Sequence, residues 1–534
     1  MKRLLQVIAF IAIISTQSLR AQYEINPNDI DMDMMRKVQL AQIAINGLYV
    51  DSVDAKKVAE DAINGMLSKL DPHSAYSNAE ETKKLNEPLQ GGFGGIGIQF
   101  NMLDDSLIVI ATVPKGPSEK AGILAGDRII AVDGVAIAGV KMSRDTIMKK
   151  LRGEVGTKTV LTIARGGKKK PLKFKITRAT IPMPTIDAYY MIAPGIGYVH
   201  LERFGAESDK ELRKAIQEMQ KQGMHDLILD FQMNGGGYLE AAVDIANEFL
   251  THRDLIVFTE GRSSPRRNFY AKGGGIFRDG RVAILVDEYT ASAAEIVSGA
   301  IQDHDRGIII GRRTFGKGLV QRPIPLPDGS MIRLTVAHYY TPSGRCIQKP
   351  YEKGKKEDYE KDLENRYNRG EFTSIDSIHL DSTKVYYTLK AHRSVYSGGG
   401  IMPDYFIPLD TTKVTKYHSK LRQTDVIVNE VLRYVDCHRE EIKRKYPEFN
   451  DFKAQFVVPQ ALVDSIRSRA EKEKQLKPEN EEEWNRTLED LRFSLKTQIA
   501  YNLWERNEYY RFFNERSDIV KKALELLGDS KTSE

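Results

Sequence analysis

Residues 282–296 read VAILVDEYTASAAEI, and this stretch decides the fold expected for the middle of the chain. Residues 282–287 are typical of a buried strand, because five apolar residues precede Asp287 at its end. A short turn then leads to Ser292, and Ile296 and Val297 mark the inner face of a following helix. A strand that runs into a helix is the building unit of α/β proteins with a partly parallel sheet.

The same alternation of strand and helix patterns precedes this stretch. Apolar runs at 197–201 and 226–230 are typical of buried strands, and periodic segments at 208–222 and 238–250 are typical of helices. We therefore expect an α/β domain over residues 179–409.

A glycine-rich stretch, GGFGGIG at 91–97, opens a second kind of pattern. Short β-like runs follow it, separated by turn signals such as Asp133-Gly134. These runs lie at 96–100, 107–113, 127–132, 159–164 and 172–176. They predict a small β-rich domain over residues 91–178.

Helical patterns occupy both ends of the chain. Apolar residues recur at helical spacing in the segment 28–90, and the extension 410–534 is helical and highly charged. We expect this extension to be a structural wrap, with a dimerisation element and a partner-binding module as alternatives. Residues 351–368 are dense in lysine, glutamate and aspartate, so they predict a surface excursion.

The composition bounds the class of protein. A chain of 534 residues suggests about three or four domains, hence a multidomain α/β fold. With 41% hydrophobic and 28% charged residues, it is neither wholly disordered nor a multi-span membrane protein. A net charge of +6 without a concentrated basic stripe predicts no nucleic-acid partner. Only Cys346 and Cys437 are present, without a Cys-x-x-Cys, so no thiolate zinc site is expected, and pairing of the two stays open.

The N-terminus is typical of a secretory signal. Two basic residues precede the apolar run 4–14, and a polar stretch follows it. Cleavage after Ala21 would leave a chain that begins at Gln22, so residues 1–21 are expected to be a signal peptide. An uncleaved anchor is the alternative. Both versions place the bulk of the chain outside the cytoplasm, in the periplasm or another extracytoplasmic compartment, and a membrane-associated form stays open.

Ser292 is a candidate nucleophile because of its place at the start of a helix. The carboxyl edge of the sheet is where α/β folds place ligands, and a helix N-terminus favours negative charge developing nearby. Serine is also a common N-cap, and this plain structural role is the better explanation when Ser292 is taken alone. A nucleophilic serine needs a base, and His304 and His338 are the nearest histidines downstream.

A second candidate segment is GRRTFGKGLVQ at 311–321. Lys317 lies between glycines after an apolar run. A lysine acts as a base only when it is neutral, which requires a desolvated site that lowers its pKa. Gln321 can orient the lysine amine without adding charge. The alternative is a glycine-rich turn with a solvated lysine.

The third segment is DFQMNGGG at 230–237, between a strand and a helix. Glycines let backbone N–H groups approach a ligand closely. The loop, together with the N–H of Ala293, is therefore a candidate oxyanion hole. A dinucleotide loop is the rival interpretation, but Gly-x-Gly-x-x-Gly is not matched, and a simple glycine-rich turn is a further alternative.

Taken together, these segments resemble the C-terminal processing peptidases, or tail-specific proteases, a Ser–Lys family. The resemblance covers roughly residues 38–408. It is carried by TASAAEI at 290–296, TFGKG at 314–318 with Gln321, YYTPSGR at 339–345, LDPHS at 70–74 and GGGIMPD at 398–404. It implies Ser292 as nucleophile, Lys317 as general base and Gln321 as the residue that positions Lys317. It implies the backbone N–H groups of Gly236 and Ala293 as oxyanion donors, and neither metal nor cofactor.

The resemblance also implies that the β-rich domain is a PDZ domain inserted into an α/β Ser–Lys peptidase core. Its carboxylate-binding loop would be Gly94, Gly95, Ile96 and Gly97. An extended substrate tail would add a strand there, and its apolar last side chain would fill a pocket. The implied partners are proteins with exposed apolar C-terminal tails, and an adaptor protein and a homo-oligomer stay open.

The sequence departs from the family pattern in the glycine-rich loop. Phe231-Gln232 stands where the family commonly has Leu-Arg, and Gly235 stands where it has Pro. Loss of the arginine would change how tail binding couples to the active site. Two rival functions stay open: an inactive PDZ scaffold, against which the intact set of Ser292, Lys317 and Gln321 argues, and a Ser–His hydrolase that uses His304 or His338.

Overall fold

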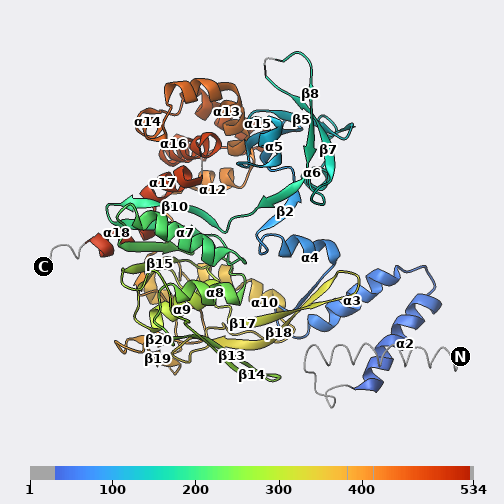
Figure 1. Ribbon diagram of the computed structural model, residues 1–534, viewed down its shortest axis with the longest axis vertical. Coiled ribbons are helices and arrows are strands. Elements are labelled where there is room, and N and C mark those ends of the chain that lie inside the picture. Colours follow the sequence, from blue (N-terminus) through green and yellow to red (C-terminus); the bar gives the residue numbers. More distant parts are fainter. Residues whose placement is uncertain (1–30, 167, 382, 413, 505, 529–534) are drawn as a thin grey trace.

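The computed structural model describes residues 31–528 apart from positions 167, 382, 413 and 505 (Figure 1). The expected signal peptide, residues 1–21, lies outside the described residues. Within the described part of the chain, three sheets have five or six strands each, and most helices lie against one of them or in a separate C-terminal cluster.

The first sheet, here called the core sheet, contains the stretch 282–286. Its order is β10-β11-β12-β15-β16-β21, and every neighbouring pair is parallel except β10 with β11. The strands are β10 (Ile186–Ala193), β11 (Ile196–Leu201), β12 (Asp226–Asp230), β15 (Val282–Val286), β16 (Ile308–Gly311) and β21 (Tyr405–Phe406). The predicted partly parallel sheet is confirmed.

Helices cover both faces of the core sheet because alternate strand residues point to opposite sides. Leu227 and Leu229 pack with Ile296 and other residues of the three helices on one face, whereas Ile228 packs with Ile519 on the other face. The first face carries α7 (Ser208–Gln220), α8 (Leu239–Asn247) and α9 (Ala293–Asp303), and the second carries α18 (Asp518–Gly528). The second face is thus closed by the last described residues of the chain.

An antiparallel sheet lies next to α9 and was not predicted. Its order is β1-β18-β13-β14, and β17 also pairs with β18. The strands are β1 (Ala75–Ser77), β13 (Leu255–Gly261), β14 (Ser264–Tyr270), β17 (Leu319–Pro325) and β18 (Met331–Tyr340). We call it the hairpin sheet. It joins the turn after the N-terminal helices to the strand that follows Lys317.

The β-rich region forms its own sheet and core, here called the β domain. The order is β3-β4-β5-β7-β8, with β6 paired to β5. Its elements are β3 (Ile98–Leu103), β4 (Ser106–Thr112), α5 (Pro117–Ala121), β5 (Arg128–Val132), β6 (Val135–Ala136), α6 (Arg144–Leu151), β7 (Lys158–Ala164) and β8 (Leu172–Thr177). A ribbon of β2 (Gly92–Gly95) and β9 (Ala179–Pro182) connects it to the rest of the chain.

The N-terminal segment contains α2 (Met32–Leu48), α3 (Ala55–Leu67) and α4 (Ala79–Asn86). The predicted helices are present, but no residue of α2 is buried.

The charged stretch 351–368 is mostly exposed, as the prediction of a surface excursion requires, but two of its side chains turn inward. It forms α10 (Lys356–Glu360) and α11 (Asp362–Asn368), and Tyr359 and Arg366 are buried. Charge density did not reveal this because Arg366 is paired inside with Glu371. Short elements follow: η2 (Ile375–Ser377), β19 (Val385–Tyr387) and β20 (Ser394–Tyr396).

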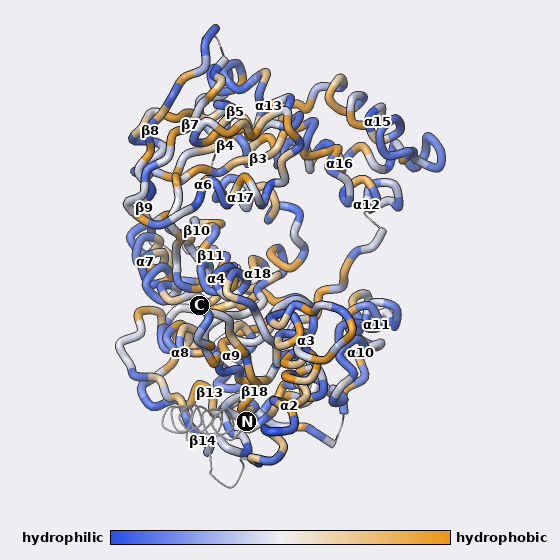
Figure 2. The backbone as a smooth tube through the Cα atoms, turned by 90° about the vertical axis from the view of Figure 1, so that its right-hand side faces the viewer, coloured by the Kyte–Doolittle hydropathy of each residue, from blue (hydrophilic) through white to orange (hydrophobic). Residues whose placement is uncertain are grey.

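The helical extension has a hydrophobic core of its own. It consists of α12 (Lys416–Arg422), α13 (Val426–Lys445), α14 (Phe449–Gln455), α15 (Gln460–Lys474), α16 (Glu481–Leu503) and α17 (Arg506–Arg516), and α18 continues it onto the core sheet. In Figures 1 and 2 the extension lies beside the β domain, at the top of both views. Among the described residues, no helix has the length and apolar character needed to cross a membrane.

Candidate active site

Ser292 lies in the turn between β15 and α9, half-buried and with strained backbone. Its φ of 58° and ψ of −116° are unusual for a residue with a side chain. Such conformations cost about 1–3 kcal/mol and cluster at functional sites. A simple N-cap serine has extended backbone, so the strained turn favours the nucleophile over the N-cap explanation.

Lys317 lies in the segment between β16 and β17, beside the predicted orienting residue. Its Nζ donates a hydrogen bond of 3.0 Å to Oε1 of Gln321. Nε2 of Gln321 in turn donates to the backbone oxygen of His73 at 2.5 Å. The second bond fixes which end of the amide faces the lysine, so the lysine meets a neutral acceptor and no carboxylate.

The surroundings of Lys317 favour its neutral form. Burial, aided by the positive charge of Arg333, lowers the pKa of Lys317 to about 8. Lysine in water has a pKa near 10.4, so a substantial neutral fraction is present at mildly alkaline pH. This is the condition that a lysine base requires.

The carboxylate of Glu295 joins the backbones of Ser292 and Lys317. Its Oε2 accepts the N–H of Ser292 at 2.8 Å and that of Lys317 at 2.9 Å, and its Oε1 accepts the N–H of Gly316 at 2.8 Å. The hydroxyl of Thr314 donates to the same carboxylate. Glu295 is fully buried, and burial raises its pKa. The four hydrogen bonds to this carboxylate oppose the effect of burial, because they favour its ionised form.

Tyr339 joins the same two backbones from the carbonyl side. The hydroxyl of this β18 residue lies 3.0 Å from the backbone oxygen of Ser292 and 2.5 Å from that of Lys317. Glu295 and Tyr339 therefore hold Ser292 and Lys317 next to each other through both N–H groups and both carbonyls. The Ser292 hydroxyl and the Lys317 amine are not hydrogen-bonded to each other within the described part of the chain; Gln321 is the recorded partner of the amine.

The glycine loop, residues 231–237, packs directly against this turn. A Cβ placed on Gly236 would lie 2.8 Å from Cβ of Ser292 and 3.0 Å from the backbone nitrogen of Ala293. The N–H of Ala291 donates to the backbone oxygen of Asn234 at 2.9 Å. The carboxylate of Asp287 accepts the N–H groups of Met233 and Thr290, which closes the turn.

The two predicted oxyanion donors differ in availability. The N–H of Ala293, first in α9, makes no hydrogen bond to any described residue. The N–H of Gly236 donates to Oδ1 of the buried Asn234 at 2.8 Å. Asn234 is itself anchored by its Nδ2, which donates to the backbone oxygen of Leu201 at 2.7 Å. The structure thus brings both donors beside Ser292, with the Gly236 donor already engaged.

The LDPHS segment, residues 70–74, lies beside the lysine. The carboxylate of Asp71 accepts the N–H groups of His73 and Ser74, and the hydroxyl of Thr335 from β18 at 2.9 Å. The ring nitrogen Nε2 of His73 lies 2.9 Å from the hydroxyl of Tyr359. Burial and the charge of Lys317 lower the pKa of His73 to about 3, so its ring is neutral.

The histidines of the rival Ser–His mechanism have other neighbours. His304 follows α9, and its Nε2 lies 2.7 Å from the backbone oxygen of Leu255. His338 lies on β18 with its Nδ1 3.9 Å from Sγ of Cys346. Within the described part of the chain, neither imidazole is hydrogen-bonded to Ser292. The thiols of Cys346 and Cys437 are both free in the structure, one in the peptidase region and one on α13.

Three of the four predicted carboxylate-loop residues line a cavity in the β domain. These are Gly95, Ile96 and Gly97, and Gly97 has a φ of 75°. Gly94 does not line this cavity. A Cβ on Gly94 would lie 2.1 Å from the backbone oxygen of Gly153, so this position needs glycine for backbone packing.

Sequence reasoning missed Glu295, Tyr339 and His73 as members of the site. Glu295 carried a usable signal, because a glutamate three residues after a serine is the capping-box pattern. Tyr339 and His73 lie in segments with recognisable motifs, but nothing local indicates their contacts. Their positions depend on the pairing of β1 and β17 with β18.

Comparison with known proteins matches most of the chain to family models. Residues 195–360 match peptidase family S41, and residues 94–176 match the PDZ domain. Residues 9–82 match the N-terminal domain of the activating protease CtpB. Residues 417–505 match a family of unknown function.

Individual relatives agree with these models. A carboxy-terminal-processing protease of Bartonella bacilliformis is 40% identical over 305 residues, which are 56% of this chain and 69% of the relative. The carboxy-terminal processing protease CtpB of Bacillus subtilis is 34% identical over 318 residues, 59% of this chain and 66% of the relative. Among solved structures, a photosystem II D1 C-terminal processing protease is 30% identical and covers 60% of this chain and 91% of its own, with a TM-score of 0.34. The match thus spans about two thirds of the length of these curated relatives.

Proposed function

Because the chain belongs to the carboxy-terminal processing proteases of peptidase family S41, we propose that it is an endopeptidase that cuts proteins near exposed, apolar C-terminal tails, with Ser292 as nucleophile and Lys317 as general base. The observation that carries this proposal is the double bridge between Ser292 and Lys317. Glu295 accepts both N–H groups, and the one hydroxyl proton of Tyr339 is shared between the two carbonyl oxygens. An arrangement this specific positions a pair of residues that act together.

The reaction begins with proton transfer from the Ser292 hydroxyl to the neutral Lys317 amine. The serine oxygen forms a bond to the scissile carbonyl carbon, and the N–H of Ala293 stabilises the developing oxyanion. The N–H of Gly236 joins it when Asn234 releases that donor. The Lys317 ammonium then gives its proton to the leaving amine as the C–N bond breaks. Water, deprotonated by Lys317, hydrolyses the acyl-enzyme and regenerates Ser292.

The PDZ domain supplies the recognition of the tail. Its loop Gly95–Gly97 offers backbone N–H groups for a terminal carboxylate, and the cavity beside β3 accepts the last side chain. The signal-like N-terminus indicates that the substrates are extracytoplasmic proteins. Recognition by the free C-terminus favours substrates whose tail is unfolded and accessible.

The proposal is tested by cleavage of an unfolded reporter protein. The purified chain is incubated with a reporter that ends in apolar residues and with one that ends in lysines. We expect fragments from the wild type, faster with the apolar tail, and a loss of at least about 1,000-fold for Ser292→Ala and Lys317→Ala. Lys353→Ala, at an exposed lysine, is the matched control.

Three outcomes would contradict the proposal. Tail binding without cleavage by the wild type indicates the scaffold function. Full activity of Lys317→Ala with loss in His304→Ala or His338→Ala indicates a Ser–His hydrolase. Equal rates on the two reporters show that the tail is not recognised.

A further inference from the structure

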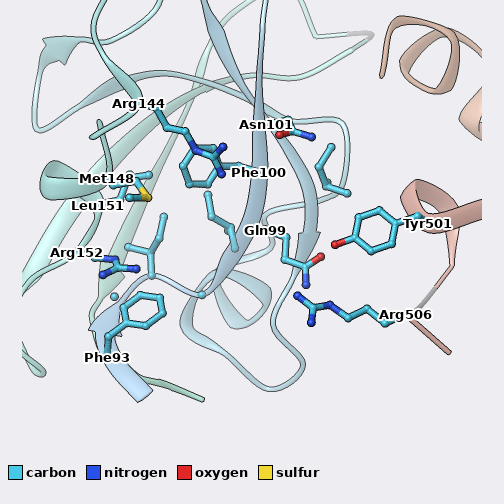
Figure 3. Close-up of a pocket in the computed structure, with 15 residues that line it drawn as sticks. Phe93, Gln99, Phe100, Asn101, Arg144, Met148, Leu151, Arg152, Tyr501 and Arg506 are labelled. Atoms are coloured by element: carbon cyan, nitrogen blue, oxygen red, sulfur yellow. The ribbon is translucent and has the colours of Figure 1, made fainter. Parts of the chain in front are cut away.

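The cavity of the PDZ domain, here called the tail groove, lies between β3 and α6 and has a volume of about 320 Å³ (Figure 3). β3 is an edge strand, because β4 is its one neighbour among the described strands of the sheet. The open edge of a strand can pair with an extended peptide. The loop Gly95–Gly97 lines the groove, so a terminal carboxylate bound to its N–H groups would fix where the peptide ends.

The side chains of β3 divide the tail groove into two walls. Ile98 and Phe100 point to the core of the PDZ domain, on the side of α6. Leu103 lies on the same face of β3 as Gln99 and Asn101, because alternate residues of a strand share a face. It packs against Leu432 of the helical extension. Gln99 and Asn101 therefore face the extension, as Figure 3 shows for Gln99.

The helical extension supplies the second wall through two side chains. Tyr501, near the end of α16, and Arg506, at the start of α17, both line the tail groove opposite Gln99 (Figure 3). They are far from the PDZ domain in sequence. An isolated PDZ domain would leave this side of a bound peptide in water.

This second wall is held in place at both ends. On the PDZ side, Leu432 is buried against Leu103, and Arg128 forms an ion pair of 2.7 Å with Asp436 of α13. On the peptidase side, Arg506 forms an ion pair with Asp187 of β10. The wall is therefore part of the folded molecule and does not depend on a bound peptide.

The tail groove is positively charged. Arg144, Arg152 and Arg506 line it, and no carboxylate does. Arg152 pairs with Glu87 at 2.6 Å, and Arg506 is paired as described. Arg144 lies over the ring of Phe100, 5.4 Å from its centroid, and has no acidic partner among the described residues. A free cation on the α6 wall favours an anionic side chain next to it.

We propose that the tail groove is a composite site in which the PDZ domain and the helical extension together hold a C-terminal tail that ends in an apolar residue and carries an acidic residue two positions before it. Alternation along the bound strand places the last and third-last side chains on the α6 wall, where Arg144 pairs with the acidic one. The penultimate side chain contacts Tyr501 of the extension. This inference rests on the proposed recognition of tails and adds the identity of the residues recognised.

Peptide binding to the full chain with Ser292→Ala tests the Arg144 assignment without requiring cleavage. Fluorescent eight-residue peptides with a free C-terminus end in leucine and differ in the third-last residue: Asp, Asn or Lys. We expect Asp to bind about 5-fold more tightly than Asn. Arg144→Gln removes this preference, and Arg144→Glu reverses it in favour of Lys. Arg444→Gln, at an exposed arginine of α13 outside the groove, keeps it.

A second comparison tests the wall made by the extension. Tyr501→Ala should lower the affinity for peptides with a penultimate phenylalanine by about 10-fold. It should leave the affinity for peptides with a penultimate glycine unchanged. Tyr387→Ala, at an exposed tyrosine of β19 outside the groove, should change neither. Circular dichroism confirms that each variant is folded.

Several results would overturn the composite site. Equal binding of an amidated peptide shows that the groove does not read the C-terminus. Equal affinity for the Asp and Lys peptides would show that Arg144 does not pair with the third-last residue. Unchanged peptide affinity in Tyr501→Ala would show that the extension does not contact the tail. Any of these, combined with cleavage that still depends on Ser292 and Lys317, overturns this inference and leaves the proposed peptidase intact.

Discussion

At the residue scale, the site depends on groups whose surroundings change their chemistry. Ser292 has a backbone conformation that few residues with a side chain adopt. Burial and the positive charge of Arg333 lower the pKa of Lys317 against the opposing charges of Glu295 and Asp71. The buried carboxylate of Glu295 accepts hydrogen bonds from three backbone N–H groups. It therefore holds the lysine's backbone without pairing with its amine.

The pH dependence of cleavage follows from the pKa of Lys317. Since the base must be neutral, kcat/KM should rise with pH through about 8 and fall about 10-fold for each unit below it. Arg333→Gln removes a positive charge that disfavours protonation, so the midpoint should move to higher pH. Stopped assays of reporter cleavage from pH 6 to 10 measure both curves. A profile that stays flat below pH 8 would exclude Lys317 as the base.

Two neighbouring glycines provide a matched test of the glycine loop. Gly236 has a φ of 98° and no room for a Cβ, whereas a Cβ on Gly235 would meet nothing within 4 Å. Gly236→Ala should therefore lower the free energy of unfolding by more than about 1 kcal/mol and abolish cleavage. Gly235→Ala should keep the wild-type stability. Urea unfolding and reporter cleavage of the two variants decide this, and equal behaviour would contradict the packing argument.

At the element scale, the site is assembled by three connections that are far apart in sequence. The turn from β15 to α9 carries Ser292, the segment before β17 carries Lys317, and the LDPHS segment precedes β1. β18 unites them, because it pairs with both β1 and β17 and contributes Tyr339. The hairpin sheet is therefore the element that aligns the base with the nucleophile.

Two adjacent tyrosines of β18 test this role. The Tyr339 hydroxyl shares its proton between the carbonyl oxygens of Ser292 and Lys317, whereas the ring of Tyr340 stacks on Phe258. Tyr339→Phe should cost about 1–3 kcal/mol of stability and lower kcat about 10-fold or more with little change in KM. Tyr340→Phe should leave kcat unchanged. Steady-state kinetics on a tail peptide separate the two, and an unchanged kcat in Tyr339→Phe would refute the alignment role.

At the scale of the whole molecule, the helical extension contacts both the PDZ domain and the peptidase core. α13 packs on β3 and β4 through Leu432, and α18 covers the second face of the core sheet through Ile519 and its neighbours. One continuous segment thus contacts both the PDZ domain and the peptidase core. A structural wrap stays the prediction for this extension.

The contribution of α18 to stability can be measured with two isoleucines. Ile519 is 5% exposed against the core sheet, whereas Ile375 is 51% exposed. Ile519→Ala should lower the free energy of unfolding by about 2–5 kcal/mol, because it leaves a cavity under the sheet. Ile375→Ala should change it by less than about 0.5 kcal/mol. Urea midpoints of both variants provide the comparison, and similar midpoints would show that α18 is dispensable for the fold.

The sequence alone determined the elements whose patterns are local. The strand-turn-helix unit around Ser292, the partly parallel character of the core sheet and the β-rich domain follow from hydrophobic periodicity and turn residues. The candidates Ser292, Lys317 and Gln321 were found because their segments are short and distinctive. These features depend on residues within one or two turns of one another.

Only the tertiary structure decided how these elements meet. β17 contains two prolines, which argue against a strand, and the pairing of β17 and β18 with β1 and β13 joins distant segments, so the hairpin sheet was not predicted. The bridges through Glu295 and Tyr339, the engagement of Gly236 by Asn234 and the approach of Tyr501 to the tail groove are contacts between distant segments. Such contacts come from the packing of whole layers, which no local pattern of side chains encodes.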